Sequence, residues 1–171
     1  AQLCLHRAAR PGGPGTRPHR AHDLQLGRRE RRAAGRGIRL RAIEQTCRSY
    51  HIHTERILLA GFREGAALAY RLGLMYPEKF GGLISLNGCT PRRGPLLRLP
   101  EVRTLRVLIG HGIANAIVPL SQAKQDFRLF YTAGMPVKMM TYPTTHRIHP
   151  DMLTDMDRWI QGHIQDEHDN P

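Results

Sequence analysis

The feature that most constrains this chain is a short apolar run that leads through a Gly-x-x-x-Gly frame into an alanine-rich segment. The run RILLAG ends at Gly61, and the residues that follow read FREGAALAYRLGLMY and stop before Pro77. A short continuous apolar run is typical of a strand buried on both faces of a parallel sheet, and the Ala- and Leu-rich segment is typical of a helix. Gly61 and Gly65 allow strand and helix to crowd together. We therefore predict a strand, a tight turn centred on Arg63, and a helix.

The alternation of strand and helix continues to the end of the sequence. The predicted elements are a helix over 40–50, strands at 56–61, 81–88, 106–110 and 137–142, and helices at 64–76, 119–134 and 150–164. Gly134 is placed to end one helix, and Pro150 to open the next. This pattern predicts an α/β fold of three α/β/α layers around a mostly parallel sheet. Sites in such sheets lie at the carboxyl ends of the strands, where we expect the loops 61–65, 111–119 and 143–150.

The composition indicates a single soluble domain in a reducing compartment. The chain has 171 residues, 40% of them hydrophobic. No apolar run approaches the roughly 20 residues that cross a bilayer, and the first ten residues are too weakly apolar for a secretory signal. Cys4, Cys47 and Cys89 are odd in number and form no CxxC pair. We expect free thiols and a cytoplasmic location.

The positive charge gathers in the first quarter of the sequence. Of the net charge of +12, a balance of +9 lies in residues 1–41, which hold 11 Arg and 2 acids. Residues 1–37 mix Pro, Gly and Arg with little apolar periodicity, so we predict a disordered tail. Two alternatives stay open, an arm that binds a polyanion and a stretch of GC-rich gene read out of frame. The predicted domain spans 38–165, and 166–171 form a polar tail.

Three segments carry a resemblance to a known family. From about Ile38 to Ile164 the chain resembles the α/β-hydrolase superfamily, in particular its phospholipase/carboxylesterase branch of small serine esterases. RILLAGFREGAALAYRLGLMYPEKFGGLISLNG resembles the family's strand, sharp turn, helix and next strand. VLIGHGIANAIVP resembles its acid loop, H-G-x-x-D-x-V-V-P, and YPTTHRIHPDML its histidine loop, G-H-x-I-x-x-E-x-L. The resemblance implies hydrolysis of carboxylic esters through an acyl-enzyme, without a cofactor.

Two of the three catalytic places hold unexpected residues. The resemblance puts Arg63 at the nucleophile, Asn115 at the acid, His146 at the base, and the backbone amide of Glu64 at one oxyanion donor. A guanidinium stays protonated and has no nucleophilic lone pair. A neutral amide cannot stabilise an imidazolium as a carboxylate does, and in a serine protease this loss costs on the order of 10⁴ in turnover. We expect a degenerate esterase of absent or very low activity, with a small ester or carboxylate as its ligand.

Other readings of the same residues stay open. Arg63 stands at a predicted helix N-terminus, where an anion could bind. The pairs His51/His53 and His146/His149 have spacings that suit a metal ion, but no acidic or cysteine cluster supports them, so we expect no metal. No nucleotide-binding pattern follows a strand.

The resemblance covers only the later part of the family's fold. A full member has several strands before the nucleophile strand, whereas here one predicted helix precedes it. We therefore expect about four strands, with the strand at 56–61 on the edge of the sheet. An open apolar edge invites association, and the sequence leaves the oligomeric state open. A second oxyanion donor has no convincing counterpart.

Overall fold

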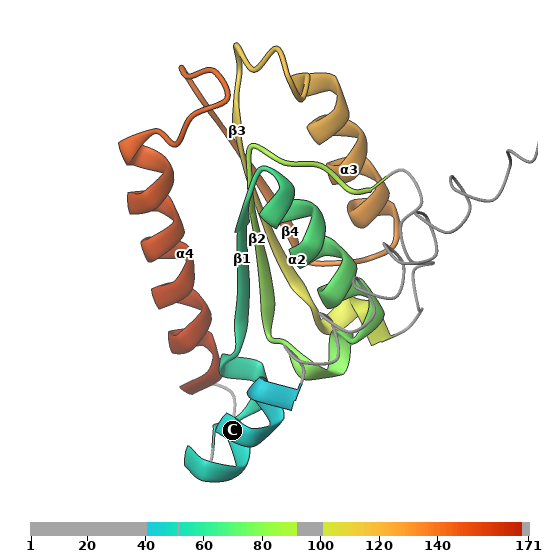
Figure 1. Cartoon of the computed structure of the whole chain (residues 1–171), viewed down its shortest axis with the longest axis vertical. Helices are drawn as coiled ribbons and strands as arrows, with labels where there is room; N and C mark the ends of the chain where they lie inside the picture. The colour runs from blue at the N-terminus through green and yellow to red at the C-terminus, as the bar shows by residue number, and fades with distance from the viewer. Residues whose placement is uncertain (1–40, 51, 92–100, 169–171) are drawn as a thin grey trace, which may run out of the picture. The chain divides into compact units, whose positions relative to one another are not determined.

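The computed structural model describes residues 41–50, 52–91 and 101–168 (Figure 1). The chain divides into two units, residues 1–43 and 44–171, and of the first only 41–43 are described, in a helix over 41–50. The predicted tail over 1–37 lies outside the described residues. The elements of the second unit are η1 (Thr54–Arg56), β1 (Leu58–Phe62), α2 (Glu64–Met75), η2 (Pro77–Lys79), β2 (Gly82–Leu86), η3 (Glu101–Thr104), β3 (Arg106–Gly112), α3 (Leu120–Thr132), β4 (Val137–Tyr142) and α4 (Pro150–His168).

The four strands form one parallel sheet in the order β1-β2-β3-β4, which confirms the predicted fold class. The register pairs Leu58 with Gly82, Gly82 with Arg106, and Val107 with Val137. Because all strands run in the same direction, their carboxyl ends meet along one edge of the sheet. The loops after β1, β3 and β4 therefore come together. Among the described residues, β1, which leads into Arg63, lies at the edge of the sheet, as predicted.

Helices cover both faces of the sheet, as the three-layer prediction requires (Figure 1). The rings of Tyr70 in α2 and Phe130 in α3 lie 5.4 Å apart between centroids, so these two helices share a face. On the opposite face, Trp159 of α4 lies so close to Gly82 that a Cβ atom there would stand 2.8 Å from the indole. Glycine at this position lets α4 approach the sheet.

The core lies between the sheet and the helices, and it is centred on the inner strands. Every residue of β2 is buried, as expected for a strand between two neighbours. One core cluster beneath α4 consists of Ile84, Leu86, Leu108, Tyr142 and Met152, with Phe62, Met140, Met156, Trp159 and Ile160 packed against it. By contrast, β1 is only half-buried and Ala60 is exposed. The prediction that this strand is buried on both faces was wrong, because among the described residues it has one neighbouring strand.

The residues predicted to end one helix and to begin the next do so in the structure. Gly134 follows α3 with a φ of 77°, and its N–H donates to the carbonyl oxygen of Tyr131. Pro150 begins α4, which continues to His168. β1 starts two residues later than predicted and reaches Phe62. No helix among the described residues is long and apolar enough to cross a membrane.

Candidate active site

Arg63 lies in a strained turn between β1 and α2. Its φ of 55° and ψ of −119° fall in a region that residues with a side chain rarely adopt. The Arg63 N–H donates to the carbonyl oxygen of Leu86 at 3.1 Å, and its carbonyl oxygen accepts from the N–H of Ala66 at 3.1 Å. The turn is therefore fixed by the end of β2 on one side and by the first turn of α2 on the other.

Glycines permit β1 and α2 to approach closely around this turn. Of the two predicted glycines, only one is needed for this approach. A Cβ atom at Gly61 would lie 2.3 Å from the carbonyl carbon of Gly65, so no side chain fits there. A Cβ atom at Gly65 would meet no atom of the described residues within 4 Å. The crowding on the helix side instead involves Gly88, whose added Cβ would lie 2.3 Å from that of Ala66. The prediction was thus right for Gly61 and wrong for Gly65.

Asn115 is buried in the loop after β3, with 4% of its surface exposed. Its Oδ1 accepts from the backbone N–H groups of Ile117 at 3.1 Å and Val118 at 3.0 Å. Asparagine commonly closes a turn on its own chain in this way. Because both partners are donors, the atom that faces them must be the amide oxygen.

His146 meets the same oxygen of Asn115. Its Nδ1 lies 3.0 Å from Asn115 Oδ1, so Nδ1 must carry the proton and donate it. In the neutral ring, Nε2 then keeps its lone pair. Burial, and after it the nearby Arg63 guanidinium, hold the pKa of His146 below its ordinary value. The ring is therefore neutral near pH 7, in the tautomer that a general base requires.

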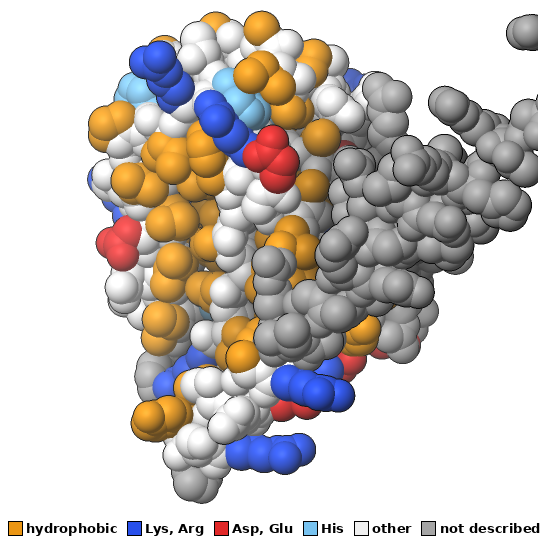
Figure 2. Space-filling model, viewed as in Figure 1, with side chains coloured by type: hydrophobic (Ala, Val, Ile, Leu, Met, Phe, Trp, Pro, Cys, Tyr) orange, Lys and Arg blue, Asp and Glu red, His pale blue; other side chains and the backbone are white. Residues whose placement is uncertain are grey.

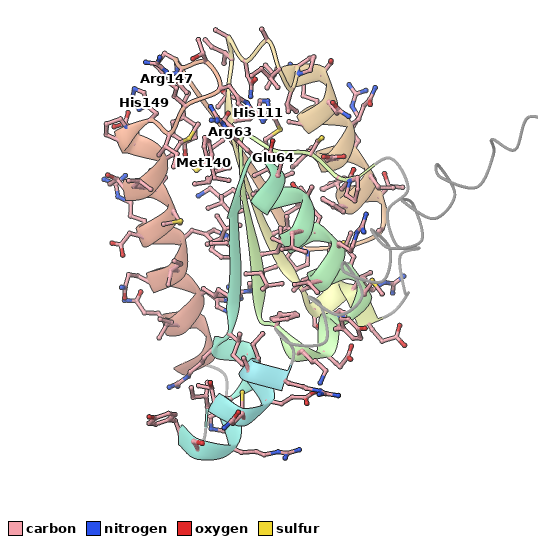
Figure 3. All side chains as sticks on the ribbon, viewed as in Figure 1. Arg63, Glu64, His111, Met140, Arg147 and His149 are labelled. Carbon is pink, nitrogen blue, oxygen red and sulfur yellow. The ribbon has the colours of Figure 1, made fainter. Side chains whose placement is uncertain are left out.

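The guanidinium of Arg63 reaches the histidine loop. Its Nη2 donates to the carbonyl oxygen of His146 at 2.9 Å, and its Cζ lies 4.9 Å from the centre of the Phe62 ring. That ring in turn lies 6.0 Å from the imidazole of His146. Figure 3 shows Arg63 and Glu64 where β1 meets α2, at the carboxyl end of the sheet. The structure brings together the three predicted places from three separate loops.

Asn87 is a positioning residue of the site that the sequence analysis missed. Its Nδ2 donates to the carbonyl oxygen of Arg147 at 2.7 Å, while its Oδ1 accepts from the N–H of Gly112 at 2.8 Å and from Nδ2 of Asn115 at 3.4 Å. It thereby joins the end of β2 to the loops after β3 and β4. Its φ of 51° suits asparagine. In the sequence, the Asn-Gly pair directly after a buried strand could have indicated this residue.

The next residues to place are the remaining histidines of the predicted pairs. His51 lies outside the described residues, and His149 Nδ1 accepts from the N–H of Asp151 at 3.2 Å. Over 41–50, 52–91 and 101–168, no three His, Cys, Asp or Glu residues lie together as metal ligands would. The nearby His111 is buried, with Nε2 2.8 Å from the carbonyl oxygen of Val118.

The carboxyl edge of this parallel sheet carries a strained strand-turn-helix, an amide-bearing loop and a histidine loop. This arrangement defines a protein of the α/β-hydrolase class. The family model for phospholipase/carboxylesterase matches residues 39–164. The chain belongs to the phospholipase/carboxylesterase family.

A protein relative agrees with this membership, and solved structures agree with the fold. Acyl-protein thioesterase 1 of Debaryomyces hansenii is 30% identical over 122 residues, which cover 69% of this chain and 53% of that protein. A Bacillus cereus carboxylesterase structure has a TM-score of 0.62 at 20% identity, over 71% of this chain and 56% of the other. Arabidopsis thaliana SOBER1 has a TM-score of 0.62 at 22% identity, over 74% and 61%. This chain spans about half the length of the protein relatives it matches.

Proposed function

We propose that this chain is a degenerate carboxylic-ester hydrolase that keeps the base of the family's site but turns over no ester. The observation that carries the proposal is the placement of Arg63. It occupies the strained turn where the family's motif has its nucleophile, and its guanidinium is engaged with the carbonyl oxygen of His146. A side chain that is always protonated and offers only donors cannot form an acyl-enzyme.

The neighbouring groups support the same proposal. His146 is neutral and in the right tautomer, but at position 63 it finds no hydroxyl to deprotonate. Asn115 orients the ring through a hydrogen bond without supplying a negative charge. An imidazolium formed during catalysis would therefore lack the stabilisation that a carboxylate gives, which is worth on the order of 10⁴ in turnover in a serine protease. In this proposal His146 is oriented as a base, while position 63 supplies no nucleophile and position 115 supplies no negative charge.

The ligand class follows from the same site. A small ester or carboxylate would place its oxygen near the backbone amide of Glu64, in the first turn of α2, where the helix dipole favours negative charge. The exposed guanidinium of Arg63 adds a fixed positive charge beside it. We propose weak binding of such ligands without turnover.

Hydrolysis of p-nitrophenyl acetate by the full chain tests this proposal. We expect no turnover by the wild type beyond the buffer rate. The double variant Arg63→Ser, Asn115→Asp should gain a measurable rate, and the further change His146→Ala should abolish that gain. Wild-type turnover that His146→Ala removes would show that the chain is an active esterase. A double variant as silent as the wild type would show that Arg63 and Asn115 are not what prevents catalysis.

The charge distribution favours a second candidate function. Most of the excess positive charge lies in residues 1–41, so this arm could hold a polyanion while the α/β unit serves as a scaffold. Binding of a DNA oligonucleotide should then weaken steeply with added salt and disappear when residues 1–37 are deleted. Binding that salt does not change, or that survives the deletion, would refute this candidate.

A further inference from the structure

The turn at Arg63 presents hydrogen-bond donors to an incoming anion. The guanidinium donates through Nη2 to the carbonyl oxygen of His146, and the exposed side chain keeps its other N–H groups for a ligand. The first N–H groups of a helix have no acceptor within that helix, and in α2 the first of them belongs to Glu64. Figure 2 shows basic, acidic and histidine side chains gathered on the surface at this end of the sheet. A fixed positive charge and a backbone amide therefore stand side by side.

A hydrogen-bond acceptor lies beside these donors. Only 8% of the surface of His146 is exposed, and its Nδ1 donates to Asn115. Nε2 therefore keeps a lone pair, and no donor within the described part of the chain pairs with it. In a Ser-His-Asp triad this nitrogen faces the nucleophile, so here it faces the turn at position 63. A largely buried acceptor without a donor is costly, so a ligand that brings a proton is favoured here.

Together these three groups distinguish between classes of anion. The oxygens of a carboxylate or a sulfate carry no proton near neutral pH, so they only accept and would leave Nε2 of His146 unpaired. A phosphate monoester loses its second proton at about pH 6. Its monoanion offers oxygens that accept and one hydroxyl that donates. It matches all three groups of the turn, whereas a carboxylate matches only the two donors.

We propose that the turn at Arg63 is a binding site for the monoanion of a phosphate monoester. Its charged oxygens accept from the N–H of Glu64 and from the Arg63 guanidinium, and its hydroxyl donates to Nε2 of His146. The inference rests on the proposed function, in which this site binds an anion without turnover. It adds that the ligand must carry a proton, so that His146 serves in recognition where it no longer has a nucleophile to activate.

The groups around His146 make the pH dependence of binding diagnostic. Burial is the largest influence on the pKa of His146 and holds it below its ordinary value, while Arg63 and His111 lower it further and Glu64 raises it. The ring is therefore neutral above about pH 6.5. Over the same range the ligand monoanion gives way to the dianion, about tenfold per pH unit, and the dianion has no proton for Nε2. Affinity should thus fall as the pH rises, whereas attraction by the Arg63 charge alone would strengthen with the second ligand charge.

Calorimetric titration of the full chain with methyl phosphate and dimethyl phosphate tests the proposal. Dimethyl phosphate carries one negative charge but no proton, so it is the matched control. We expect methyl phosphate to bind about tenfold more tightly than dimethyl phosphate at about pH 6, and to lose this advantage by about pH 8. Equal affinities for the two esters, an affinity for methyl phosphate that rises with pH, or no binding of methyl phosphate would overturn the proposal.

Variants assign the binding to this turn. His146→Phe removes Nε2, so the affinity for methyl phosphate should fall to that for dimethyl phosphate. Arg63→Met should weaken the binding of both esters about tenfold, whereas Arg147→Met removes an equal charge and should leave both unchanged. Circular dichroism of each variant shows whether it is folded. A preference for methyl phosphate that survives in His146→Phe, or equal losses in Arg63→Met and Arg147→Met, would refute the assignment.

Two further measurements separate related outcomes. Phosphatidic acid carries the same monoester on a lipid, and phosphatidylglycerol is an anionic diester. Cosedimentation with phosphatidic acid vesicles in excess of that with phosphatidylglycerol vesicles would identify a lipid headgroup as the source, whereas methyl phosphate binding without it would identify a soluble monoester. Turnover of p-nitrophenyl acetate by the wild type would refute the proposed function. A chain that shows no turnover and does not bind methyl phosphate would refute only this inference.

Discussion

The guanidinium of Arg63 supports the main chain of His146, donating to its carbonyl oxygen at 2.9 Å across a separation of 83 residues. In the family's motif these two places hold the nucleophile and the base, whose side chains react with each other. Here the contact runs from a side chain to a backbone group. It therefore stabilises the histidine loop.

The strain at Arg63 predicts an unusual order of stability among its variants. Both Arg63→Gly and Arg63→Ala lose the guanidinium, but only glycine adopts a φ of 55° and ψ of −119° without steric cost. We expect the glycine variant to exceed the alanine variant in free energy of unfolding by about 1 to 3 kcal/mol. Urea denaturation measures both values. Equal stabilities would show that the turn relaxes when the side chain is changed.

The pKa of His146 should respond to the charge at position 63. Burial is the main cause of its lowered pKa, and the Arg63 guanidinium is the second. We expect Arg63→Met to raise the pKa of His146 toward its ordinary value while burial still holds it below. Titration followed by NMR measures this pKa. Arg147→Met removes an equal charge from the next residue along the chain and serves as the control. An equal shift in both variants would contradict a specific effect of Arg63.

The same shift predicts how stability depends on pH. Because the pKa of His146 is lower in the folded chain than in the unfolded chain, the unfolded state binds protons more readily. The free energy of unfolding should therefore fall as the pH drops below about 6.5. In Arg63→Met this fall should be smaller. Urea denaturation of both chains across this range gives the difference, and an identical pH dependence would count against it.

Asn87 should be worth more to stability than an average buried amide. Asn87→Ala leaves the N–H of Gly112 and the carbonyl oxygen of Arg147 without this partner and puts alanine at a φ of 51°. We expect a loss of about 3 kcal/mol in the free energy of unfolding. Gln125→Ala, at an exposed position of α3, is the matched control and should change it little. A loss no larger than the control's would mean that the end of β2 and the loops after β3 and β4 hold together without Asn87.

The order of strands and helices could be predicted because local signals agree along this sequence. Apolar runs mark the strands, and Pro77, Gly134 and Pro150 mark helix ends where the structure has them. The placement of Arg63 in a tight turn followed from the Gly61 frame. The hydrogen bond from its guanidinium to the carbonyl oxygen of His146 did not, because this bond depends on a loop that is remote in the sequence.

Other features depend on neighbours that a pattern does not reveal. The apolar run of β1 reads like that of β2, yet its burial differs because one strand lies at the edge of the sheet. Gly65 matches the family's frame, but a Cβ atom there would contact no described residue. Asn87 reads as a turn residue, and only the folded chain shows that its amide bonds to the loops after β3 and β4.

The amide oxygen of Asn115 has a further consequence. An amide and a carboxylate have nearly the same shape, and the two backbone N–H groups that donate to this oxygen could donate to either. Replacing one by the other thus leaves the architecture of the loop intact while removing its catalytic charge. Selection for folding alone cannot retain the acid, and a protein of this kind can lose its chemistry while its scaffold is inherited unchanged.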